Sequence, residues 1–109
     1  MRRDFDLIRT ILLGVEEDGA KAFSRAEEPT LYYQAMLLHE AGYVRAVTDD
    51  QGITVFRLTR SGHDFLDSVR DDSIWNSTKD RVRKVSGSAS LEVVKAVAES
   101  ITKAMLGLS

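Results

Sequence analysis

The sequence predicts an α+β fold of the winged-helix type, mostly helical, with one antiparallel β-hairpin and additional C-terminal helices. Three observations predict it. The stretch GYVRAVTDDQGITVFRLTRSGHDFL, residues 42–66, contains two short β-rich segments, a tight turn and the start of a helix. Amphipathic helical patterns precede this stretch, and others follow it. A hairpin alone is marginally stable in water, so it must pack on those helices.

Two amphipathic helices are predicted before the hairpin. The first covers residues 4–17, with its apolar side chains on one stripe and Asp4 as its N-cap. Residues 19–29 have no clear period and are predicted to be a connector with at most one helical turn. The second helix begins at Pro29, because proline is tolerated in a first turn, and Gly42 suits its left-handed C-terminal cap.

The hairpin has two strands and a polar turn. The predicted strands are residues 43–47 and 53–58, and the turn is residues 48–52. We expect Val44, Val55 and Phe56 to cover the apolar edge that the first two helices leave open. The turn carries Asp49 and Asp50, so the hairpin tip is acidic.

Further helices follow the hairpin. Thr59 is placed to cap the first of them, with Ser61 as the alternative. A break is expected near Asp72, which we predict to cap the next helix, whose apolar stripe covers residues 74–85. Residues 86–90, SGSAS, have the composition of a flexible linker.

The final helix carries a heptad-like seam. Ser90 caps this helix, and its apolar residues recur at spacings of three and four, at Leu91, Val94, Ala98, Ile101, Met105 and Leu108. These residues either cap the core of their own chain or, through the first five, form a homodimer interface. The predicted organisation is a winged-helix-like domain over residues 1–86, followed by a linker and C-terminal helix over residues 87–109.

Composition limits the class of protein. The chain has 109 residues, of which 43% are hydrophobic and 29% charged, as in a soluble globular domain. It has no cysteine, which excludes disulfides and Cys-ligated metal and fits a reducing compartment. No apolar run approaches the roughly 18 residues that span a bilayer, and the N-terminus reads as an amphipathic helix rather than a signal peptide. We therefore expect a cytoplasmic protein without a membrane partner.

Several stretches resemble a family of small uncharacterised bacterial and prophage proteins, a domain of unknown function. They are MRRDFDLIRTILL, LLHEAGYV, RLTRSGHDFLDSVRDDSIWNSTK and a closing helix that ends in LGL, and together they cover most of the chain. The block GHDFLDSVRDDSIW is the specific part, whereas the frame "AGYV … LT" occurs in many winged-helix families. Family members often have a histidine where this sequence has Gln34, and a longer loop before that helix. The resemblance implies the fold and no particular activity.

No catalytic constellation stands out. The sequence contains no Ser-His-Asp order, phosphate loop, glycine fingerprint or metalloprotease motif. His63, Asp67 and Asp71 would share one face of an unbroken helix, a spacing that can hold a metal, but spacing alone is weak evidence. The plainer interpretation is a solvated helix face. We expect no enzyme activity, no cofactor and no metal.

A winged-helix fold makes the second helix the natural reader of a DNA major groove. The candidate nucleic-acid-binding residues are Thr30, Tyr33 and Gln34 on this helix, with Arg45, Arg57 and Arg60 on and after the hairpin. Residues 29–41 contain no lysine or arginine, the net charge is −2 and the pI is about 5.6, which all weaken electrostatic attraction to DNA.

Two functions therefore stay open. One is a non-enzymatic DNA-binding or transcriptional regulatory module, phage-related and dimeric. The other is a protein-interaction module, such as a phage factor acting on a host protein, that uses the same scaffold without DNA. The acidic hairpin tip favours a protein partner, and the scattered arginines favour double-stranded DNA.

Overall fold

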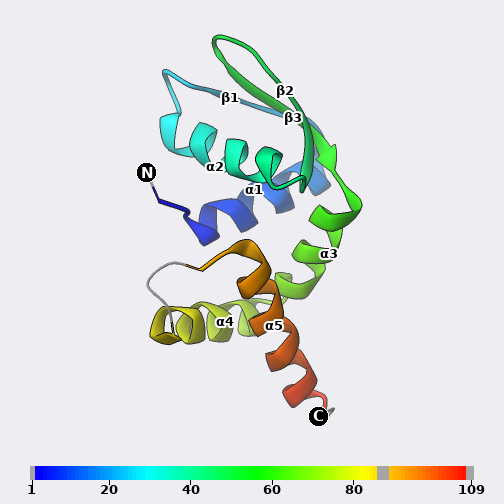
Figure 1. The fold of residues 1–109 in the computed structure, drawn as a ribbon. Coiled ribbons are helices and arrows are strands. Elements are labelled where there is room, and N and C mark those ends of the chain that lie inside the picture. The colour runs from blue at the N-terminus through cyan, green and yellow to red at the C-terminus, as the bar shows by residue number, and fades with distance from the viewer. Residues whose placement is uncertain (1, 86–88, 108–109) are drawn as a thin grey trace. The chain divides into compact units, whose positions relative to one another are not determined.

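A computed structural model describes residues 2–85 and 89–107, and Figure 1 labels their helices and strands. In chain order these elements are α1 (Phe5–Asp18), β1 (Lys21–Ser24), α2 (Pro29–Glu40), β2 (Val44–Thr48), β3 (Gly52–Leu58), α3 (Arg60–Val69), α4 (Asp72–Val85) and α5 (Leu91–Met105). The chain is thus α+β and mostly helical, as predicted. Three predicted features lie outside the described residues, namely linker residues 86–88, the side chain of Val85, and Leu108.

The ends of α1 and α2 follow from local chemistry. Asp4 Oδ1 accepts a hydrogen bond from the Leu7 N–H at 3.1 Å, which confirms Asp4 as the N-cap of α1. Pro29 opens α2 as predicted, because the first helical turn leaves its N–H groups without intrahelical partners. After α2, Gly42 has a φ of +78°, the left-handed conformation expected of a residue that terminates a helix.

The sheet has three strands rather than two. Strand β1 pairs antiparallel with β3, and the order across the sheet is β1-β3-β2. The prediction that residues 19–29 form only a connector is therefore wrong for Lys21–Ser24. Gly52 explains how β1 approaches so closely, since a Cβ at this position would lie 2.1 Å from Phe23 O. A segment of four residues is too short to show a clear period in its sequence. This strand forms because it pairs with a strand that is distant in the chain.

A bulge interrupts the β2–β3 ladder. Arg45 is paired with Arg57, whereas the next residue, Ala46, is paired with Val55, so Phe56 has no partner on β2. The side chain of Phe56 is 50% exposed, which makes the prediction that it covers the apolar edge wrong. Val55 is buried, as predicted, and alternation along β3 directs Phe56 to the opposite face.

The unit formed by residues 1–66 packs two helices on one face of its sheet. Helices α1 and α2 contact each other and the strands, with Ile8, Leu12 and Leu38 fully buried between them and the sheet residues Ile53 and Val55. The other face of the sheet is exposed. Val47 and Phe56 are the large apolar side chains that it shows to solvent.

The unit formed by residues 67–109 contains the end of α3 together with α4 and α5. Helices α4 and α5 pack on each other, and the chain divides into its two compact units after Leu66. Asp71 caps α4 through a 3.0 Å hydrogen bond from the Ile74 N–H, so the prediction that Asp72 is the N-cap is wrong by one residue. Ser90 caps α5 as predicted, with its Oγ accepting from the Val93 N–H at 3.2 Å.

Candidate nucleic-acid interface

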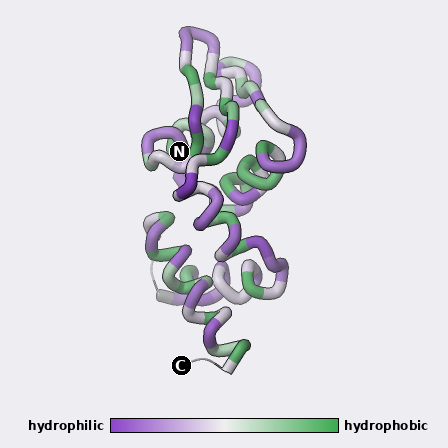
Figure 2. The backbone as a smooth tube through the Cα atoms, turned by 90° about the vertical axis from the view of Figure 1, so that its right-hand side faces the viewer, coloured by the Kyte–Doolittle hydropathy of each residue, from purple (hydrophilic) through white to green (hydrophobic). Residues whose placement is uncertain are grey.

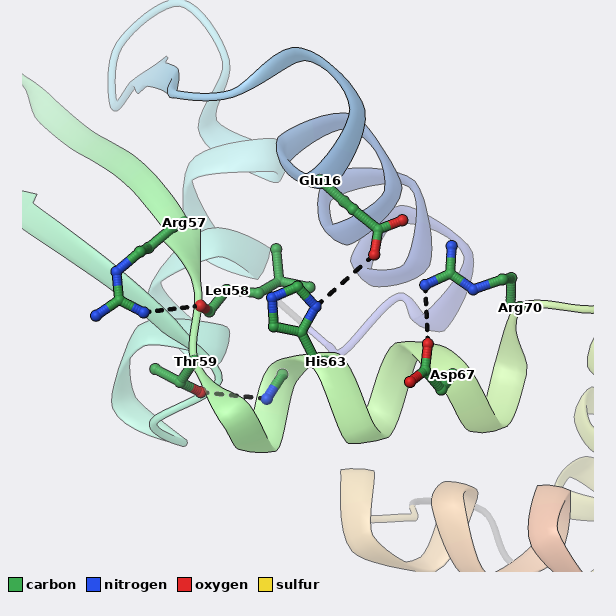
Figure 3. A network of polar contacts seen from close by, with 8 residues as sticks. Glu16, Arg57, Leu58, Thr59, His63, Asp67 and Arg70 are labelled. Atoms are coloured by element: carbon green, nitrogen blue, oxygen red, sulfur yellow. Dashed lines mark hydrogen bonds and ion pairs between the residues drawn. The ribbon is translucent and has the colours of Figure 1, made fainter.

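Cationic side chains gather on the hairpin. Arg45 on β2 and Arg57 on β3 are register partners in the antiparallel ladder, and both are exposed. Like charges directly opposite each other destabilise a ladder. The Arg57 Nη1 donates to Leu58 O at 3.1 Å (Figure 3), and neither arginine forms an ion pair with any described residue. The pair is therefore held together without an internal counter-ion.

The start of α3 is fixed against β2 by hydrogen bonds. Thr59 Oγ1 accepts from the Gly62 N–H at 3.1 Å, as drawn in Figure 3, and donates to Gly42 O at 2.6 Å. The Thr59 N–H also donates to Tyr43 O at 3.0 Å. These bonds confirm the predicted role of Thr59 as the cap of α3. They bring the first residue of α3, Arg60, to the beginning of β2.

A pocket of about 420 Å³ lies where the end of α2, strand β2 and the start of α3 meet. Its lining includes Arg45 and Arg60, so two of the three candidate arginines converge on it. Thr59, Ser61 and His39 complete the polar part of the lining, and no carboxylate contributes to it. The lining therefore offers hydrogen-bond donors and positive charge without an opposing negative charge.

Helix α2 does not present the surface that the sequence suggested. Thr30 is exposed and Tyr33 is half-buried, but Gln34 is only 1% exposed. Its Oε1 accepts from the Asp4 N–H at 2.9 Å, and its Nε2 donates to Arg2 O at 2.8 Å. The expectation that Gln34 is exposed to read a base is therefore wrong, because its amide instead ties the segment before α1 to α2.

One of the two aspartates at the hairpin tip stabilises the turn. Asp49 Oδ1 accepts hydrogen bonds from the Gln51 and Gly52 N–H groups at 2.8 and 2.9 Å. This carboxylate therefore closes the turn, while Asp50 is exposed beside it. The tip is hydrophilic in Figure 2 and lies at the far end of the hairpin from Gly42. Negative charge at the tip and positive charge at the base divide the hairpin into two electrostatic regions.

The side chains of His63, Asp67 and Asp71, whose spacing could hold a metal ion, do not form a metal site. His63 Nδ1 lies 3.7 Å from Glu16 Oε2, and Asp67 forms a 2.9 Å ion pair with Arg70, as Figure 3 shows. Asp71 lies beyond the end of α3 and caps α4. Within residues 2–85 and 89–107, no three histidine, aspartate or glutamate side chains are grouped closely enough to hold a metal ion.

The candidate dimer seam of α5 is mostly enclosed. Four of its members are buried in the single chain, namely Leu91, Val94, Ala98 and Ile101. Met105 is 64% exposed. The first four are thus already covered, which favours the alternative in which this helix caps a core.

A family described as "Hypothetical protein (DUF2513)" matches residues 2–89. The chain belongs to the DUF2513 family. A protein of Haemophilus influenzae, named "Uncharacterized protein", is 33% identical over 117 aligned residues, covering 97% of this chain and 99% of that protein. No solved structure matches the chain. The DUF2513 match covers all of α1 to α4, and therefore includes the hairpin arginines and the pocket.

One further property bears on where this DUF2513 chain can act. In the part of the chain that the structure describes, each helix is too short or too polar to pass through a lipid bilayer.

Sequence reasoning named the arginines of the candidate interface but missed two features of their surroundings. The pocket depends on α2, β2 and α3 meeting, and the lining positions from His39 to Ser61 show no motif in the sequence. The exposure of Phe56 follows from alternation with the buried Val55, because adjacent residues of a strand point to opposite faces.

Proposed function

We propose that the chain is a non-enzymatic DNA-binding module of winged-helix type that holds the phosphate backbone of a duplex through Arg45, Arg57 and Arg60. The carrying observation is the exposed cross-strand pair of Arg45 and Arg57, which has no carboxylate partner among the described residues. Such a pair is unfavourable in the free protein and becomes favourable when an anion lies between the two guanidinium groups. A phosphate backbone supplies anions at regular intervals.

The order of elements supports a winged-helix comparison with one difference. Helix α1, strand β1, helix α2 and the hairpin follow in sequence, and β1 pairs with β3. A helix-turn-helix motif has a second helix before the reader, whereas here residues 25–28 link β1 directly to α2. With no cation on α2 and Gln34 buried, base reading by α2 is weak. We therefore propose contacts to phosphates that depend little on sequence.

The test is a salt series with the full chain and a fluorescent mixed-sequence duplex. Between about 50 and 200 mM salt, log Kd should rise linearly with log salt, with a slope of about 0.9 per phosphate contact. Replacing any one of Arg45, Arg57 or Arg60 with glutamine should reduce this slope by close to that amount. Fluorescence anisotropy measures both quantities.

Arg83 on α4 provides the matched control, since it is an exposed arginine outside the cluster. Arg83→Gln removes the same charge and should leave the slope unchanged. An equal loss in Arg83→Gln would indicate general attraction rather than a defined interface. Absence of duplex binding even at low salt would remove the DNA proposal.

A second candidate, a protein partner on the exposed sheet face, is favoured by a different observation. Val47 is 58% exposed and Phe56 is 50% exposed on neighbouring strands. Exposed aromatic residues flanked by arginine are enriched at protein interfaces. The partner would place an apolar side chain on Phe56 and a carboxylate near Arg45 or Arg57.

Site-specific photo-crosslinking in cells tests this second candidate. A photoreactive amino acid replaces Phe56, and the same group at Arg83 on α4 serves as the control position. A discrete adduct that digests with protease and forms at position 56 alone is the expected result for a protein partner. Adducts that digest with nuclease, or the same adducts from both positions, would count against it.

A further inference from the structure

The pocket between α2, β2 and α3 has a chemical character of its own. Its volume of about 420 Å³ falls within the range of small-molecule sites and is larger than a bare phosphate ion requires. Ala46 contributes a small apolar side chain to the lining, beside the polar residues of α3 and α2, whereas Val44 is only 2% exposed. The pocket therefore suits a ligand with an anionic group and a compact organic part.

The start of α3 supplies the donors for such an anionic group. The Gly62 and His63 N–H groups are taken by Thr59, through its hydroxyl and its carbonyl oxygen respectively. The Arg60 and Ser61 N–H groups precede them in the first turn, and no described residue accepts from them. The side chains of Arg60, Ser61 and Arg45 line the same pocket, and neither arginine has an ion-pair partner among the described residues.

His39 is a further polar residue of the pocket lining. Its Nδ1 is buried and has no hydrogen-bond partner, and no described group bonds to the other ring nitrogen. A buried N–H without an acceptor is costly, so the proton is better placed on Nε2, the ring nitrogen that is not enclosed. His39 lines the pocket, so this tautomer provides one more donor that a ligand could engage in place of water.

We propose that this pocket binds a phosphate monoester, with the phosphate held by the first turn of α3, Arg45, Arg60 and His39. Its organic part would lie over Gly42 and Ala46. Two sources share this chemistry: the 5′-phosphorylated end of a nucleic-acid strand and a free phosphorylated small molecule. The site shares Arg45 and Arg60 with the duplex contacts proposed above, but it also needs His39 and the α3 backbone and does not include Arg57.

The experiment follows the backbone amide signals of the full-length, isotope-labelled protein during titration. The probes are inorganic phosphate, a nucleoside 5′-monophosphate and the same nucleoside without phosphate. The Arg60, Ser61 and Gly62 signals should shift saturably with phosphate in the millimolar range, about tenfold more tightly with the monophosphate, and not at all with the nucleoside. Shifts that fail to saturate, or that sodium chloride reproduces at equal ionic strength, would overturn the proposal.

Two variants locate the site. Arg60→Gln should weaken monophosphate binding about tenfold, since a charge-assisted bond of about 1.4 kcal/mol corresponds to that factor. Arg83→Gln, which removes the same charge from an exposed residue of α4 that does not line the pocket, should leave the affinity unchanged. Equal effects in the two variants would contradict a defined pocket. Amide spectra without ligand show that each variant is folded.

A final comparison distinguishes the two sources of the phosphate and also distinguishes the pocket proposal from the duplex proposal. A short oligonucleotide with a 5′-phosphate that binds more tightly than both its unphosphorylated form and the free monophosphate would assign the pocket to strand ends. Tighter binding of the free monophosphate would assign it to a small molecule. A chain that binds monophosphate but no duplex would retire the DNA proposal and leave the pocket standing. A chain that binds duplex with no saturable phosphate response would do the reverse.

Discussion

Gly62→Ala is expected to lower the free energy of unfolding by about 3 kcal/mol, at the upper end of the range for overpacked cores. Gly62 is buried in the first turn of α3. A Cβ added there would lie 2.0 Å from Tyr43 O and 3.3 Å from Leu58 Cβ. The Tyr43 carbonyl cannot easily move aside, because it accepts the hydrogen bond from the Thr59 N–H that holds α3 against the hairpin.

Gly14→Ala is the matched control. Gly14 lies within α1, and its added Cβ would meet only the end of the flexible Lys21 side chain, with Cε at 3.6 Å. This substitution should raise the free energy of unfolding by about 0.5–1 kcal/mol, since alanine favours a helix interior over glycine. Urea unfolding of both variants measures the opposite shifts in midpoint. A Gly62→Ala midpoint equal to that of the unmodified protein would contradict the close approach.

The contact at Gly62 also connects the fold to the candidate sites. It allows the first turn of α3 to lie directly on the residue that precedes β2, and this approach brings Arg60 to the pocket that Arg45 lines. A residue with any side chain at this position would push α3 and the hairpin apart. Glycine here is therefore a requirement of the interface as much as of the core.

Helix ends were the features that the sequence predicted best. Asp4, Thr59 and Ser90 each cap the helix that follows them, through hydrogen bonds to N–H groups only three residues ahead. Such interactions depend on neighbours in the chain, so the sequence pattern contains nearly all of the information. The one-residue error at Asp72 arose because Asp71 is an equally good capping residue.

Long-range pairing explains most of what the sequence missed. Strand β1 exists because β3 pairs with it and because Gly52 leaves room, and neither fact is visible within Lys21–Ser24. The bulge at Phe56 likewise depends on the register between β2 and β3. The hairpin arginines could be predicted as exposed. Their pairing opposite each other could not, because a shift of one residue in the register between β2 and β3 would have separated them.

Gln34 shows why polarity alone is a poor guide to a binding surface. Its position in α2 suggested a base-reading amide, yet its two hydrogen bonds join the segment before α1 to α2. An amide suits this task because it has an acceptor for the Asp4 N–H and a donor for Arg2 O in one group. The position is thus expected to serve the fold rather than a ligand.

This geometry predicts a pH-dependent loss of stability in Gln34→Glu. A carboxylate can accept from the Asp4 N–H but cannot donate to Arg2 O, which it would repel. Burial and this repulsion raise the pKa of the introduced carboxyl above its ordinary value of about 4.3. At pH values between the pKa of the unfolded state and the raised pKa of the folded state, the folded state keeps a proton that the unfolded state has lost. The free energy of unfolding therefore falls as pH rises.

The protonated carboxyl, in contrast, reproduces both hydrogen bonds of the native amide. Gln34→Glu should therefore be close to the unmodified protein below about pH 4 and about 3 kcal/mol less stable at pH 7, for a shift of about two pKa units. Gln34→Leu is the control, because it has no titratable group and should lose about 1–3 kcal/mol at every pH. Urea unfolding between pH 4 and 8, expressed as differences from the unmodified protein, separates the two. A flat difference for Gln34→Glu would mean that the side chain turns out to solvent and that the tie between α2 and the segment before α1 is dispensable.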